Sequence, residues 1–212
     1  MDSFNRKAFA LLFSLFIGGL VVAALIASKI IMVAGFAVPA GVLAYSLTFI
    51  VSDVVSEVWG KDCANDIVQC GFITLVMTSA LAWIAVAWPA APFWNGQESF
   101  SAVIGSTPRI VAASLVAYLV SQKHDIWLFH LLKKRTNGKH LWLRNNASTV
   151  ISQLIDSTIF VTIAFWGILP VGEVILGQWL VKLAIAVIDT PIVYMLCYGL
   201  KRQIHTADAI AS

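Results

Sequence analysis

Apolar residues dominate six stretches of the chain, each about as long as a helix needs to be to cross a lipid bilayer. A transmembrane helix takes about 20 mainly apolar residues, because an α-helix rises only about 1.5 Å per residue. The predicted spans are residues 8–31, 36–56, 67–88, 109–132, 148–168 and 174–200. The pattern predicts an all-α, polytopic membrane protein with six transmembrane helices in one bundle. No linker is evident, so residues 1–212 are predicted to form a single domain.

The composition supports the membrane prediction and excludes several other classes. Of the 212 residues, 59% are apolar and 12% are charged, whereas a soluble domain holds about 25% charged residues. The three cysteines form no CxxC pair, and the sequence contains no HExxH motif. We therefore expect no metal and no cofactor, and we expect the lipid bilayer as a partner.

Lysine and arginine are distributed unevenly among the segments that connect the six predicted spans. The N-terminal segment, the second and fourth loops and the C-terminal segment contain Arg6, Lys7, Lys61, Lys133, Lys134, Arg135, Lys139, Arg144, Lys201 and Arg202. Because basic loops stay on the cytoplasmic side, both termini are predicted to be cytoplasmic. The formal net charge of +3 follows this topology and forms no single basic patch, so no nucleic-acid partner is expected.

Polar residues inside the predicted spans mark a candidate binding site. At about 100° per residue, Thr149, Gln153 and Asp156 fall on one face of the fifth span, opposite a face of isoleucine, leucine and valine. Gln122 and Asp125 belong to a similar polar stripe on the fourth span. By helical rise, Asp125 and Asp156 both lie roughly 12 to 15 Å inside the cytoplasmic boundary. Their carboxyl groups are therefore expected to line one cavity.

Each polar residue also has a purely structural interpretation. An interhelical hydrogen bond holds helices together and is worth about 0.6 kcal/mol. Glu57 and Lys61 are four residues apart, so an ion pair along one helix face accounts for both. Asp53, one turn deeper, and Arg109, at the edge of a span, are harder to explain in this way, because charged residues within spans are costly and mark function.

Four segments, taken in order, resemble motifs of the queuosine precursor transporter family. They are SDVVSEVWGK, STPRIVAASLVAYLVSQKHDIWLF, WLRNNASTVISQLIDSTIF and WLVKLAIAVIDTPIVY. The resemblance implies a six-helix protein of the bacterial inner membrane, similar in architecture to the substrate-binding subunits of vitamin importers. It also implies import of a 7-deazaguanine, namely 7-cyano-7-deazaguanine, its aminomethyl analogue or queuine.

The resemblance further implies that polar residues of these motifs bind the substrate. The matching positions are Asp53, Glu57, Arg109, Gln122, Asp125, Asn145, Asn146, Ser148, Thr149, Gln153, Asp156 and Lys182. Asp156 and Gln153 suit the neighbouring N–H donors of a guanine edge. Donors for the carbonyl oxygen of the base are Asn145, Asn146 and Lys182. Candidates for stacking on the ring are Tyr45, Tyr118, Trp142 and Phe160.

Several mechanisms are compatible with these residues. The chain contains no Walker-type GxxxxGK[ST] motif, which favours a secondary transporter. The alternative within transport is a substrate-binding subunit that docks an ATP-driven partner. Two alternatives lie outside transport: an intramembrane enzyme that uses carboxyl groups as acid and base, and a purely structural membrane scaffold. Assembly as a homodimer is left open.

Overall fold

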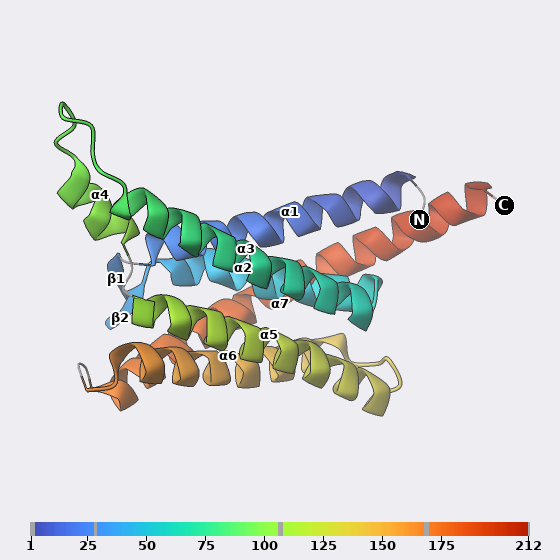
Figure 1. The fold of residues 1–212 in the computed structure, drawn as a ribbon. Coiled ribbons are helices and arrows are strands. Elements are labelled where there is room, and N and C mark those ends of the chain that lie inside the picture. Colours follow the sequence, from blue (N-terminus) through green and yellow to red (C-terminus); the bar gives the residue numbers. More distant parts are fainter. Residues whose placement is uncertain (1–2, 28, 106–107, 168–169, 212) are drawn as a thin grey trace.

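The computed structural model describes residues 3–27, 29–105, 108–167 and 170–211 (Figure 1). Its elements are α1 (Ser3–Ile26), β1 (Ile30–Val33), β2 (Phe36–Pro39), α2 (Gly41–Val58), α3 (Lys61–Ala87), α4 (Gln97–Ile104), α5 (Pro108–Arg135), α6 (Leu141–Phe165) and α7 (Val171–Ala211). Within these described residues, six helical segments are long and apolar enough to cross a membrane. This confirms the predicted polytopic, six-helix architecture.

A short β-hairpin separates the first two spans, where the sequence predicted only helix. β1 and β2 pair antiparallel, from Ile30 opposite Pro39 to Val33 opposite Phe36. Ala34 and Gly35 form the two-residue turn with φ of 48° and 87°, the left-handed geometry that closes tight hairpins. Hydropathy alone counts these apolar, β-branched residues as span residues, so the predicted ends at 31 and 36 were wrong.

Some of the other helix ends lie within a few residues of the predicted spans, as at Pro108 of α5 and Ala87 of α3, whereas others differ by whole turns. α6 begins at Leu141, not at residue 148, so the polar residues near its start belong to the helix. The predicted end of that span, residue 168, lies outside the described residues. α7 continues to Ala211, well beyond residue 200. Charged residues end a hydropathy window, but they do not end a helix whose backbone hydrogen bonds continue.

The two ends of the bundle are occupied by different elements. The N-terminus, the C-terminus and the connection between α5 and α6 lie at one end, whereas the hairpin and α4 lie at the other (Figure 1). α5 runs antiparallel beside α6, and α7 passes behind them toward the C-terminus (Figure 1). Large apolar side chains such as those of Leu81 and Ile188 are exposed on the outside, as lipid contact requires.

Apolar and polar side chains divide the interior between different helices. α1, α2 and α3 pack through an apolar cluster that includes Phe16, Leu20, Val54 and Ile67. Buried polar and charged side chains are supplied by α2, α5, α6 and α7. The interface among these four helices is therefore where binding chemistry is concentrated.

Candidate functional site

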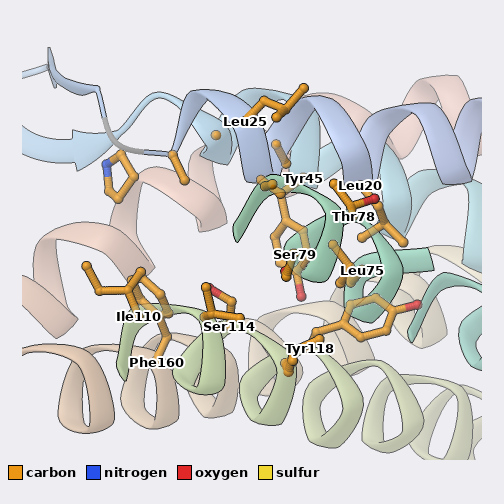
Figure 2. Close-up of a pocket in the computed structure, with 18 of the residues that line it drawn as sticks. Leu20, Leu25, Tyr45, Leu75, Thr78, Ser79, Ile110, Ser114, Tyr118 and Phe160 are labelled. Atoms are coloured by element: carbon orange, nitrogen blue, oxygen red, sulfur yellow. The ribbon is translucent and has the colours of Figure 1, made fainter. Parts of the chain in front are cut away.

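A cavity of about 810 Å³ opens in the half of the bundle that carries the hairpin and α4. Its volume lies within the usual range for small-molecule sites. Apolar side chains of α1, α3 and α5 form most of its wall, while Tyr45, Asp156, Gln178 and Lys182 supply polar groups. Figure 2 shows Tyr45 projecting into the pocket, with Tyr118 and Phe160 on the facing side.

Asp156 is the centre of the polar wall. Its Oδ1 accepts hydrogen bonds from the Tyr45 hydroxyl at 3.0 Å and from Ser121 Oγ at 3.1 Å. Its Oδ2 forms an ion pair with Lys182. The exposed fractions of Asp156 and Lys182 are 5% and 2%, so both charges are removed from solvent and neutralise each other. Lys182 Nζ also lies 5.3 Å from the centroid of the Tyr45 ring, in cation–π geometry.

The helical periodicity of α6 places Asp156 in this wall. Ser152, Gln153 and Asp156 are buried, whereas Ile151 and Leu154 on the opposite face are 44% and 39% exposed. The predicted polar face therefore points inward, as its position on the helical wheel indicated. The partner charge comes from α7, which packs against α6 and brings Lys182 within reach.

Asp53 and Asp125 form a second polar group, between α2 and α5. They are 2% and 0% exposed, and their carboxyl groups interact directly. Asp53 Oδ2 accepts a hydrogen bond from Thr149 Oγ1 at 3.3 Å. Nearby, Gln122 Nε2 donates to Thr48 Oγ1 at 3.1 Å. Of the two carboxyl groups expected in one cavity, that of Asp156 lines it, whereas that of Asp125 is not among the described lining residues.

Glu57 connects α2 to three other helices at the end of the bundle that holds the termini. Its carboxylate lies 2.8 Å from Lys133 Nζ, 2.8 Å from Arg144 Nη2 and 2.5 Å from Lys201 Nζ. The ion pair expected with Lys61 is not among the ion pairs of the described residues, because α2 ends at Val58 and Lys61 begins α3. This cluster closes the end of the bundle away from the cavity.

The comparisons with known proteins agree with these motifs. The family described as "Putative vitamin uptake transporter" matches residues 39–196. A relative named "Probable queuosine precursor transporter", from Bacillus subtilis (strain 168), is 31% identical over 171 residues, which cover 78% of this chain and 74% of the relative. The chain belongs to the queuosine precursor transporter family. The resemblance of the four motifs is thereby confirmed, and so is a transporter as opposed to an enzyme.

Two further relatives of this transporter match over shorter regions. The "Queuosine precursor transporter" of Escherichia coli (strain K12) is 24% identical, with 64% of this chain and 59% of the relative covered. The "Probable queuosine precursor transporter" of Haemophilus influenzae (strain ATCC 51907 / DSM 11121 / KW20 / Rd) is 24% identical, with 59% and 51% covered. No solved structure matches the chain.

Several predicted site residues of the transporter lie away from the cavity. Arg109 is exposed and donates to the carbonyl oxygens of Ile163 at 2.5 Å and Trp166 at 2.9 Å, so it caps the end of α6. Asn146 links α6 to α7, since its Oδ1 accepts a hydrogen bond from Thr190 Oγ1 at 3.1 Å. Trp142, a stacking candidate, is 53% exposed and is not among the described cavity residues.

Two buried amides of α6 have carbonyl oxygens without a partner in the described part of the chain. They belong to Asn145 and Gln153, each 3% exposed. Neither residue is among the described residues that line the cavity. Of these predicted donors and acceptors of α6, Asp156 lines the cavity, whereas neither amide is among the described lining residues.

Gln178 is a cavity residue of the transporter that the sequence motifs did not indicate. It is 6% exposed, it lines the cavity, and its Oε1 finds no partner among the described residues. It precedes Lys182 by four residues on α7 and therefore shares its helix face. A helical wheel centred on Lys182 would have identified it.

Proposed function

We propose that this transporter imports a 7-deazaguanine queuosine precursor across the bacterial inner membrane and recognises it with the Asp156–Lys182 pair. The observation that carries the proposal is a carboxylate and an ammonium group side by side in the wall of a large cavity. The names of the relatives from Bacillus subtilis and Escherichia coli support the substrate class.

The pair matches the hydrogen-bonding edge of the base. A 7-deazaguanine presents an exocyclic N–H and the ring N1–H as neighbouring donors, followed by a carbonyl oxygen as acceptor. A carboxylate can accept both donors, and an adjacent ammonium group can donate to the carbonyl oxygen. In our proposal Asp156 takes the two donors and Lys182 takes the carbonyl oxygen. The base then satisfies the two charges that pair with each other in the structure.

Aromatic and amide side chains around the pair suit a flat heterocycle. Tyr45, Tyr118 and Phe160 line the cavity and offer faces for stacking. Gln178 Oε1, which has no hydrogen-bond partner among the described residues, offers an acceptor for a further N–H of the base. Because these groups come from one chain, the proposal holds for a monomer and for a homodimer.

The cavity chemistry favours a neutral base. Asp156 and Lys182 are the charged residues among the described residues of the lining, and they are used in recognising the guanine edge. A 7-cyano group is uncharged and fits an apolar wall, whereas an aminomethyl group is a cation near neutral pH and finds no second carboxylate there.

We therefore expect unlabelled 7-cyano-7-deazaguanine to compete for uptake at lower concentration than the aminomethyl analogue. Competition against radiolabelled 7-cyano-7-deazaguanine in cells measures this preference. Equal competition by the two bases would contradict the assignment of the cavity to a neutral ligand.

For topology and mechanism, we propose cytoplasmic termini and secondary transport. The end of the bundle that holds the termini is rich in lysine and arginine, as cytoplasmic ends are. The Glu57 cluster closes that end and the cavity lies in the opposite half, an arrangement suited to alternating access.

Two measurements test the proposal. Purified protein in liposomes without nucleotide should take up radiolabelled 7-cyano-7-deazaguanine. Cells that lack both this transporter and precursor synthesis should regain queuosine in transfer RNA when they carry the gene and are fed the base. Uptake that requires an added ATPase partner would favour the binding-subunit alternative, and absence of binding by folded protein would reject the substrate.

Replacing Gln178 with leucine should weaken precursor binding without affecting folding. Loss of one hydrogen bond between neutral groups costs about 0.5 to 1.5 kcal/mol, which is roughly a 2- to 13-fold rise in Kd. Titration of purified protein by intrinsic tryptophan fluorescence measures it. The matched control is Gln203→Leu on the exposed surface of α7, which should leave Kd unchanged. Equal Kd values for Gln178→Leu and the wild type would remove Gln178 from the site.

A further inference from the structure

The carboxyl groups of Asp53 and Asp125 meet in the interior, and no basic side chain in the described part of the protein pairs with them. Both oxygens of Asp125 and Oδ1 of Asp53 lack a hydrogen-bond partner among residues 3–27, 29–105, 108–167 and 170–211. The other buried acids are neutralised, Glu57 by three basic side chains and Asp156 by Lys182. The Asp53–Asp125 pair forms no ion pair with any described residue.

Two ionised carboxylates cannot remain in contact in such a place. Burying one unpaired charge is already very costly, and like charges at contact distance add to the cost. One proton shared between the two groups removes a charge and provides the donor for a hydrogen bond between them. The site therefore needs a cation, and a proton is the smallest cation that fits between the two carboxyl groups.

Two further polar side chains, those of Ser152 and His124, lie next to the pair. Ser152 lies beside Asp125, and its hydroxyl is 3.0 Å from His124 Nδ1. His124 is half-buried, and its ring packs against Trp127, which is 50% exposed. A hydroxyl and an imidazole can relay a proton to and from a neighbouring carboxyl group.

The surroundings of the pair contain few other titratable groups. On α7 the Cys197 thiol lies within electrostatic range of Asp53. On α5, His124 reaches the pair through Ser152. On α6, Asp156 lies one helical turn after Ser152 and is paired with Lys182 of α7. On α2 itself Glu57 is one turn away and paired. α1 and α3 place no charged side chain beside the pair in the described chain.

The Asp53–Asp125 pair lies one helical turn from contacts of Asp156 on both α5 and α6. Ser121, which donates to Asp156, precedes Asp125 by four residues on α5. Ser152, beside Asp125, precedes Asp156 by four residues on α6. A change in the charge of the pair that shifts α5 or α6 therefore reaches the hydrogen bonds of Asp156.

We propose that the Asp53–Asp125 pair is the proton-binding site that couples precursor import to the proton gradient, with Ser121 and Ser152 linking it to Asp156. This inference rests on the proposed function. A proton binds a carboxylate oxygen of the pair when the site faces outward, crosses with the neutral base and leaves on the cytoplasmic side. Each proton moves one positive charge inward, so uptake should respond to both the pH gradient and the membrane potential.

The test uses full-length protein in liposomes with radiolabelled 7-cyano-7-deazaguanine. An acidic exterior, set about one pH unit below the interior, should drive the wild type to roughly tenfold accumulation when one proton accompanies each base. The Asp125→Asn variant mimics the protonated group, so it should bind the base and exchange it across the membrane at equal pH. It should fail to accumulate the base in response to the gradient.

Controls separate this inference from the proposed function. Asp66→Asn changes an exposed aspartate of α3 and should accumulate the base as the wild type does. Asp53→Asn serves as the second variant should Asp125→Asn fold poorly. Gradient-driven accumulation by both folded variants, no response of the wild type to pH, or accumulation driven by sodium at equal pH would each overturn the proton site. Loss of binding and exchange in folded variants would also overturn it. Absence of binding and exchange by the wild type would reject the proposed function instead.

Discussion

Asparagine at position 156 is expected to abolish precursor uptake. In our proposal the Asp156 carboxylate accepts two N–H groups of the base, and hydrogen bonds to a charged group contribute about 1.5 to 3 kcal/mol each. An asparagine has one carbonyl oxygen and presents an NH₂ group to the second donor. The loss should be at least about 3 kcal/mol, or roughly a hundredfold weaker binding. Uptake in whole cells and Kd for purified protein measure the effect.

The same substitution leaves Lys182 as a buried cation without its partner, so folding must be tested together with binding. Lys182 is 2% exposed, and breaking a buried ion pair by removing one partner costs about 3 to 5 kcal/mol. The double variant Asp156→Asn, Lys182→Met removes both charges and should regain most of the lost stability without regaining uptake. The exposed Asp66→Asn variant controls for loss of a carboxylate. Normal uptake by a folded Asp156→Asn variant would remove Asp156 from the substrate site.

Glutamine at position 57 is expected to produce the largest loss of stability among single substitutions at the closed end. The Glu57 carboxylate is the shared partner of Lys133, Arg144 and Lys201. Arg144 is 1% exposed and also donates to the Gly138 carbonyl oxygen at 2.9 Å. A neutral amide at position 57 leaves the buried guanidinium of Arg144 without a counter-charge, which costs about 3 to 5 kcal/mol of folding stability.

A loss of this size should lower the melting temperature in detergent by roughly 10 °C for a chain of this length. Glu98→Gln, on the exposed surface of α4, removes the same charge and should cost less than about 1 kcal/mol. The fraction of folded protein after heating, followed by size-exclusion chromatography, measures both. If the Glu57→Gln and Glu98→Gln variants have the same melting temperature, the Glu57 cluster does not stabilise the closed end.

Local patterns predicted much of the fold and part of the site. Six apolar stretches fix the number of spans, because a helix must satisfy its backbone hydrogen bonds within the bilayer. The helical periodicity of the α6 sequence predicted that Gln153 and Asp156 point away from lipid, and both side chains are buried. The hairpin at Ile30–Val33 and Phe36–Pro39 escaped prediction, because hydropathy does not distinguish an apolar strand from an apolar helix end.

By itself, the sequence determined the membrane class, the six spans, the inward face of α6 and the motifs of the family. Only the tertiary structure decided which polar groups meet. Asp156 pairs with Lys182, Asp53 meets Asp125, and Glu57 binds three basic residues of other helices in place of Lys61. The physical reason is that helical periodicity reports the direction of a side chain on its own helix, whereas a partner depends on which helices are neighbours and at what depth they align.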